Sequence, residues 1–156
     1  MSGEVETRLK NLGLTVPEAA APVANYVGWV RSGSQVFVSG QVTLRDGKPE
    51  YIGKLGAEID LETGKAAAEL CAINIVAQLK QACEGDLDRV SRIVRLGGYV
   101  NSTPDFTQQP QVINGASDLM VAIFADKGRH SRAAVSVASL PLGVAVEIDC
   151  VAEIVD

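Results

Sequence analysis

Two charged residues near the C-terminal end, Arg132 and Glu147, are the strongest candidates for chemistry in this sequence. Arg132 begins an alternating stretch in which Ala134 and Ser136 share its face, and Glu147 lies in a second alternating stretch beside Asp149. A guanidinium next to a residue as small as Ala134 has room for a ligand carboxylate held by two parallel hydrogen bonds. The pair therefore indicates a small-molecule site, with surface charges of little energetic value as the alternative.

Three further positions are candidates for lining such a site. Gly40, in the run Ser39-Gly40-Gln41, permits close approach of another group to the backbone, or else marks a β-bulge. Tyr26 offers a hydroxyl, with half-buried packing as the alternative. Asn114 projects from a predicted helix, where solvent exposure is the alternative.

Metal and catalytic-triad chemistry are poorly supported by the sequence. It contains no Walker loop, no GxGxxG after a strand, no HExxH and no GxSxG. His130 is the only histidine, and its place between a helix and a strand predicts a cation near the exposed carbonyl groups of a helix end.

The composition is that of a folded protein with one hydrophobic core. The chain has 156 residues, of which 47% are hydrophobic and 21% charged, and this length predicts a single domain over residues 1–156. A net charge of -5 without a basic run disfavours nucleic-acid binding. Without a signal-like start or a membrane-length apolar segment, and with Cys71, Cys83 and Cys150 predicted to be buried reduced thiols, we expect a cytoplasmic protein.

The first half of the chain reads as an arm, a hairpin and a loop. Residues 1–23 form the arm, with a short helix at residues 4–12 followed by a Pro-Ala-rich segment that cannot pack much. Residues 26–44 predict a β-hairpin that turns at residues 32–34. Asp46 and Gly47 predict a further turn, and residues 48–58 an exposed loop.

Two amphipathic helices are predicted. The first begins at Asp60 or Thr63 as the cap and ends near Gly85, and the second has Pro110 in its first turn and ends near Gly128. In both helices the apolar positions are spaced four, three and four residues apart: Ala66, Leu70, Ile73 and Ala77, then Val112, Ala116, Leu119 and Ile123.

Three more strands complete the pattern. Residues 89–100 read as a strand with a bulge or a close approach by another backbone at Gly97-Gly98, and residues 132–138 and 144–150 as two strands joined by a turn at residues 140–143. The order β, β, α, β, α, β, β predicts an α+β fold with a mostly antiparallel sheet and two helices on one face. Small residues beside charges, such as Ala134 and Ala138, predict that the other face meets another subunit.

The expected hairpin separates the two charged candidates. If it turns about Pro141 and Leu142, Ser136 lies nearly opposite Glu147, and Arg132 is four residues further along, about 13 Å away at ~3.3 Å per residue. A compact site using both charges therefore requires two subunits with the ligand between them.

With these residues assembled, the chain resembles the Rid family, also called YjgF-type reactive-intermediate deaminases, in its longer branch with an N-terminal extension. The matching segments are residues 24–27, 36–41, 85–90 and 132–153, of which the last is the most specific. The resemblance implies a subunit similar to chorismate mutase of the trimeric kind, a homotrimer with clefts between neighbours, and no metal or cofactor.

The resemblance also implies an activity, the hydrolysis of small 2-imino or enamine acids to 2-oxo acids and ammonia. Arg132 would bind the substrate carboxylate and Glu147 would position or activate water, while Tyr26, Ser39, Gly40, Ala134 and Asn114 would line the cleft. Ala134 stands where the deaminase subgroup usually has cysteine, and Ala133 where it has serine. Two alternatives stay open: a trimeric binder of small carboxylates without turnover, and, with less support, RNA cleavage, a label often attached to the family.

Overall fold

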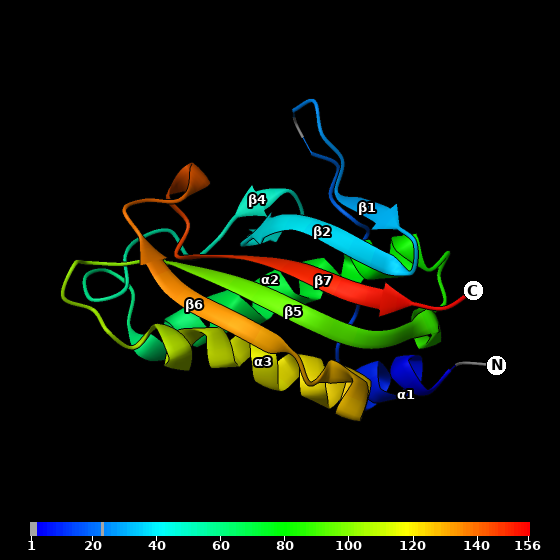
Figure 1. Ribbon diagram of the computed structural model, residues 1–156. Helices are drawn as coiled ribbons and strands as arrows, with labels where there is room; N and C mark the ends of the chain where they lie inside the picture. The colour runs from blue at the N-terminus through cyan, green and yellow to red at the C-terminus, as the bar shows by residue number, and fades with distance from the viewer. Residues whose placement is uncertain (1–2, 23) are drawn as a thin grey trace.

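The computed structural model describes residues 3–22 and 24–156 and places a twisted sheet over two long helices (Figure 1). The long elements are α2 (Leu61–Ala82), β5 (Val90–Asn101), α3 (Gln109–Phe124), β6 (Ser131–Val137) and β7 (Val146–Ile154). Before them come α1 (Glu4–Asn11), β1 (Trp29–Ser32), β2 (Gln35–Val42), β3 (Leu44–Arg45) and β4 (Lys48–Pro49). Short 3-10 turns lie at η1 (Leu87–Arg89), η2 (Ala125–Gly128) and η3 (Pro141–Gly143).

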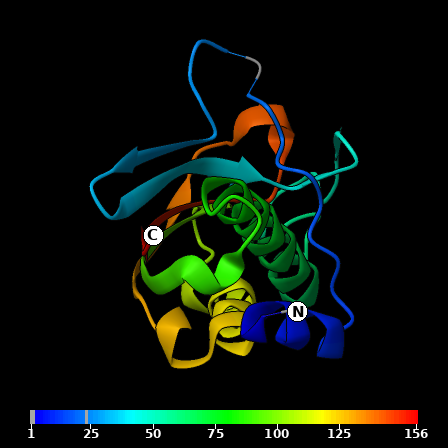
Figure 2. The ribbon, with the colours of Figure 1, turned by 90° about the vertical axis from the view of Figure 1, so that its right-hand side faces the viewer.

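The main sheet has five strands in the order β1-β2-β7-β5-β6. Every neighbouring pair in it is antiparallel except β5 and β6, which run parallel. Helices α2 and α3 both lie against one face, and the other face carries no helix among the described residues (Figure 2). The predicted α+β class, with two helices on one face of a mostly antiparallel sheet, is confirmed.

Strand β7 shows why one face is buried. Its side chains alternate, with Val146, Ile148, Cys150, Ala152 and Ile154 buried among the helices and the residues between them facing outwards. The hydrophobic core therefore lies between the sheet and the helices α2 and α3.

The helix ends follow their capping residues. Asp60, one of the two predicted caps, accepts a hydrogen bond from the backbone N–H of Thr63 at 2.8 Å. Helix α2 ends one residue earlier than predicted, because Glu84 adopts the left-handed conformation (φ 54°) and the N–H of Gly85 then reaches the carbonyl of Lys80 at 2.8 Å. Pro110 lies in the first turn of α3, as predicted.

The glycine pair in β5 admits side chains. A Cβ atom at Gly98 would lie 2.7 Å from the side chain of Ile113, so glycine lets α3 pack closely on this strand. Neither predicted alternative holds at this pair. The register of β5 against β7 shifts before Gly97, between Val90 and Arg95, and the atoms closest to a Cβ at either glycine belong to side chains and not to another backbone.

The expected hairpin between residues 132 and 149 is wrong. Strands β6 and β7 belong to the same sheet, but β5 lies between them and pairs with both. The connection over residues 138–145 therefore crosses the end of β5 instead of turning tightly. Ser136 is level with Val146 through Val100, so the predicted register along the strands is nearly right although the pairing is not.

The loop over residues 50–58 is less exposed than predicted. Leu55 is fully buried, and its backbone N–H donates to the carbonyl of Asn101 at 2.9 Å, while its own carbonyl accepts from Thr103. The turn at Asp46 and Gly47 joins β3 to β4, as expected.

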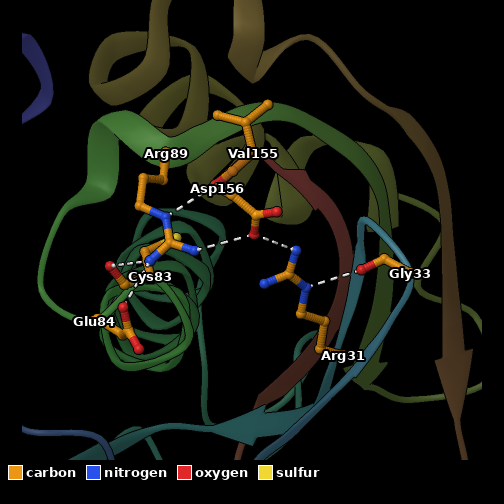
Figure 3. Close-up of polar contacts among 7 residues, drawn as sticks. All are labelled: Arg31, Gly33, Cys83, Glu84, Arg89, Val155 and Asp156. Atoms are coloured by element: carbon orange, nitrogen blue, oxygen red, sulfur yellow. Dashed lines mark hydrogen bonds and ion pairs between the residues drawn. The ribbon is translucent and has the colours of Figure 1, made fainter.

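Two arginines fasten the C-terminal end of β7 to its surroundings (Figure 3). Arg31 lies 2.8 Å from the carboxylate of Asp156, and Arg89 donates through Nε to the carbonyl of Val155 at 2.9 Å. Arg89 also donates to the carbonyl of Cys83 at the end of α2. These contacts join the β1–β2 hairpin, β7 and α2 at one end of the molecule.

The N-terminal arm is docked on the helical layer. Val5 and Leu9 of α1 are almost fully buried, and the chain then runs past α2, where Gln78 donates to the carbonyl of Ala20 at 3.0 Å (Figure 2). The predicted short helix is thus confirmed. Met1, Ser2 and Val23, which also belong to the predicted arm, lie outside the described residues.

Two further observations concern the class of protein. Among residues 3–22 and 24–156, no helix is both long and apolar enough to cross a membrane. The three cysteines are buried and free.

We expect Asp88→Ala to loosen α1. The N-cap residue Gly3 makes no side-chain hydrogen bond to the helix, and the Asp88 carboxylate instead accepts the N–H groups of Glu4 and Val5 at 3.1 and 3.0 Å. Loss of such a cap costs about 1–2 kcal/mol. Hydrogen exchange should therefore speed up at the α1 amides. Asp126→Ala, which removes a fully exposed carboxylate, is the control; equal α1 exchange in the two variants would contradict this docking.

Candidate functional site

Arg132 lies on edge strand β6 and points toward the helices. It is level with the buried Leu96 of β5, and residues level with each other on neighbouring strands share a face. Its Nη1 donates to Oδ1 of Asn114 at 2.8 Å and to Oγ of Ser117 at 3.2 Å, both on α3. Within the described chain, Nε and Nη2 of Arg132 have no hydrogen-bond partner, so this edge of the guanidinium is available to an acid.

Ala134 occupies the same side of β6 as Arg132. It is level with Gly98 and packs partly against the hydrophobic core. The expectation that Ala134 belongs to the face that meets another subunit is therefore wrong, because the parity of β6 directs Arg132 and Ala134 toward α3. The outward-facing apolar residues are instead Val30, Phe37 and Val135, whose exposed fractions are 52, 45 and 49%.

Glu147 lies in the middle of the sheet and faces away from the helices. It is level with Tyr99 of β5 and Val42 of β2, and it is half-buried. Strand β2 changes register between Val38 and Gln41, and any Cβ atom at Gly40 would collide with the Glu147 carboxylate. Both readings of Gly40 therefore hold, since it lies in a bulge and admits a close neighbour.

The electrostatic surroundings of Glu147 favour its protonated form. Burial raises its pKa, and the nearby Asp149 carboxylate raises it further. Tyr99 donates its hydroxyl to Asp149 at 3.2 Å, and that carboxylate in turn raises the pKa of Tyr99. Because no cation pairs with Glu147 among the described residues, this carboxyl group is suited to exchange protons closer to neutral pH than an exposed one.

Ser39 ties the Tyr26 segment to the bulge of β2. Its hydroxyl donates to the carbonyl of Val27 at 2.7 Å, and its N–H donates to the carbonyl of Gly28 at 2.9 Å. Tyr26 precedes β1 and is 56% exposed, which is more than the half-buried packing role considered from the sequence would require. Tyr26 lines a hollow between the arm and α2.

The candidate residues therefore form two groups within one chain. Arg132, Asn114 and Ala134 lie on the helix side at the β6 edge, whereas Glu147, Gly40 and Ser39 gather near the middle of the sheet. Arg132 and Glu147 point to opposite faces, with β5 between their strands. The expectation that they do not touch within one chain is met, although for a different geometric reason.

Ser117 and Tyr99 were not recognised from sequence. Ser117 follows Asn114 by three residues on α3, so the two side chains lie on the same face of the helix. This spacing is the one signal in the sequence that both could contact Arg132. His130 was expected near carbonyl groups, and its Nδ1 does lie 2.6 Å from the carbonyl of Gly128. It also contacts Ser117, at 2.8 Å from Nε2 to Oγ.

Neither metal ligands nor an activated thiol adds to the site. Within the part of the chain that the structure describes, no three or more His, Cys, Asp or Glu side chains are placed to hold a metal ion. Burial raises the pKa of Cys150 to about 12 and raises that of Cys71 as well. These thiols therefore stay protonated and are poor nucleophiles.

We expect Glu147→Gln to stabilise the fold at neutral pH. A folded-state pKa raised above the unfolded value means that the carboxyl group contributes stability at acid pH and loses it as the pH rises through the folded pKa. The glutamine amide does not ionise and so avoids this loss. The difference in free energy of unfolding between the variant and wild type should therefore shrink toward acid pH. Urea unfolding between about pH 4 and pH 8 measures it. Glu69→Gln, at an exposed position, is the control; a variant less stable than wild type at neutral pH would refute the effect.

Comparison with known proteins covers nearly the whole chain. Residues 6–154 match the family model described as YjgF/chorismate mutase-like, putative endoribonuclease. Protein TCP17 of Trypanosoma cruzi is 50% identical over 154 residues, which cover 98% of this chain and 96% of that protein.

Solved structures agree with this match. A crystal structure from Shewanella oneidensis, named a putative endoribonuclease, is 40% identical with a TM-score of 0.93, covering 97% of this chain and 100% of that one. RidA from the Antarctic bacterium Psychrobacter is 28% identical with a TM-score of 0.62, covering 88% and 94%. The chain therefore belongs to the YjgF, or Rid, family.

Proposed function

We propose that this protein hydrolyses small 2-imino or enamine acids to 2-oxo acids and ammonia in a cleft between subunits of a homotrimer. The observation that carries the proposal is the Arg132 guanidinium, which Asn114 and Ser117 hold through Nη1 alone. The remaining edge, Nε and Nη2, matches the two oxygens of a carboxylate. Family membership and the fold shared with a RidA protein support the same reading.

The chemistry asks for orientation and proton transfer. Arg132 binds the carboxylate of the substrate and thereby fixes the adjacent C=N bond. Water adds to the carbon, the nitrogen gains protons and leaves as ammonia, and a carbonyl group remains. Glu147, whose pKa is raised by burial, positions the water and shuttles the protons. Tyr26, Ser39, Gly40 and Ala134 line the cleft, and the reaction needs no cofactor because imines already hydrolyse in water.

A shared cleft follows from the placement of the two charges. Arg132 and Glu147 face opposite sides of one sheet, so both can reach one small ligand only if they come from different chains. The open sheet face supports such an assembly, since Val30, Phe37 and Val135 expose apolar surface there. We therefore propose that neighbouring subunits meet over this face.

A binder without turnover is the second candidate function. Ala134 motivates it, because a methyl group supplies neither a nucleophile nor a proton at the position where related deaminases carry a thiol. The two functions differ in one measurable respect, since a binder would hold a 2-oxo acid through Arg132 and leave the rate of imine loss unchanged.

We expect wild-type protein to speed the loss of 2-aminoacrylate or 2-iminobutyrate generated by a dehydratase, and Arg132→Ala to reduce kcat/KM by about 100-fold or more, as for loss of a bidentate carboxylate contact. Absorbance of the imine and release of ammonia measure it. Arg129→Ala is the matched control, because that arginine lies three residues before Arg132, at the end of η2, and its side chain is 70% exposed.

Three outcomes separate the candidate functions. Equal imine loss with and without protein would refute the enzyme. If a 2-oxo acid then still bound to wild type and not to Arg132→Ala, the binder would stand. Cleavage of a single-stranded RNA by wild type, unchanged in Arg132→Ala, would instead favour the nuclease label carried by relatives.

We further expect inactive Arg132→Ala and Glu147→Gln chains to restore activity when they are coexpressed. A mixed interface pairs the intact Arg132 of one chain with the intact Glu147 of its neighbour, which random assembly of equal amounts places at about one quarter of the clefts. Light scattering should give the mass of three subunits. A single-subunit mass, or mixed protein as inactive as either parent, would overturn the shared cleft.

A further inference from the structure

A second layer of side chains lies behind Arg132. Ser117 on α3 stands between Arg132 and His130, with its hydroxyl 3.2 Å from Nη1 of the arginine and 2.8 Å from Nε2 of the histidine. The other ring nitrogen of His130, Nδ1, lies 2.6 Å from the carbonyl of Gly128. All three side chains are half-buried.

For a neutral imidazole at His130, elementary donor and acceptor rules fix the direction of every bond in this row. The Gly128 carbonyl only accepts, so Nδ1 of His130 carries a hydrogen. A neutral imidazole has one N–H, which leaves Nε2 bare and able to accept the hydroxyl hydrogen of Ser117. Arginine only donates, so the Ser117 oxygen accepts from Nη1. The row therefore runs Arg132 to Ser117 to His130 to Gly128, each group donating to the next.

The far end of the row is fixed by packing. A Cβ atom at Gly128 would collide with the carbonyl of Met120, so glycine lets η2 lie directly on α3. The carbonyl that anchors His130 is thus held by the same helix that carries Ser117. Asn114, one turn earlier on α3, grips the same Nη1 and completes the clamp.

We propose that Ser117 and His130 are positioning residues that hold the Arg132 guanidinium with its Nε and Nη2 edge turned toward the substrate carboxylate. The proposal rests on the proposed function of Arg132. Long arginine side chains lose rotamer freedom when they bind, and a clamp that has already removed this freedom strengthens carboxylate binding. The effect belongs to substrate binding and leaves the proton transfer at Glu147 unchanged.

Four substitutions test the row. Ser117→Ala removes the central hydroxyl and Ser117→Thr keeps it, while His130→Leu removes the acceptor and His130→Gln keeps an acceptor at the place of Nε2. Ser131→Ala is the matched control, because Ser131 is next to Arg132 on β6 but points to the other face and donates to the carbonyl of Val94. Each variant is assayed for imine hydrolysis and for 2-oxo acid binding.

We expect Ser117→Ala and His130→Leu to raise KM and the 2-oxo acid Kd by roughly threefold to tenfold, as for one lost hydrogen bond. Their kcat should change less than twofold, and Ser117→Thr, His130→Gln and Ser131→Ala should resemble wild type. Ser117→Ala indistinguishable from Ser131→Ala would overturn the proposal. So would equal losses in Ser117→Ala and Ser117→Thr, which would indicate a packing defect.

A second readout separates this proposal from the proposed function. Rotation of the Arg132 guanidinium, followed by nitrogen-15 NMR in the full chain without substrate, should be faster in Ser117→Ala than in wild type and Ser117→Thr. If Arg132→Ala had no effect on hydrolysis or binding, the proposed function would fail. The positioning role of Ser117 would still stand if guanidinium rotation were faster in Ser117→Ala than in wild type. Unchanged rotation in Ser117→Ala would refute the clamp itself.

Discussion

The pairing of β7 with both β2 and β5 is the constraint on which the rest of this structure depends. It makes β7 the middle strand of the sheet, with every second side chain buried against the helices. Ile148 and Cys150 then anchor the core, and Glu147 and Asp149 are left on the open face in a partly desolvated setting. A shift of one residue in this register would move the buried side chains to the open face and the carboxylates into the core. The same register therefore determines both the packing of the core and the placement of the carboxylates.

The parallel pairing of β6 with β5 separates the candidate charges. It puts β6 at the edge of the sheet and aligns Arg132 with the buried Leu96, so the guanidinium meets α3 instead of the open face. Each chain thus presents the Arg132 guanidinium on one side of the sheet and the Glu147 carboxyl group on the other. This division is the physical basis of the proposed site shared between copies of the chain.

Much of the architecture could be read from local signals, because periodicity and caps act over short distances. The four-three-four spacing around Ala66 and Val112 gave two helices, and Asp60 and Pro110 marked their starts. Gly40 was recognised as a position of close approach. The buried Leu55 was missed, because the backbone hydrogen bonds that hold it in place are made with Asn101 and Thr103, far along the chain.

The sequence by itself determined which side chains carry charge, which segments alternate and which residues can cap or turn, since these depend on neighbours a few residues away. Tertiary structure decided what lies beside Arg132: β5 inserted between two strands that read as a hairpin, and the helical face of Asn114 and Ser117 came to rest against β6. Strand order is set by packing of the whole sheet on α2 and α3, a long-range balance of buried surface that no local pattern encodes.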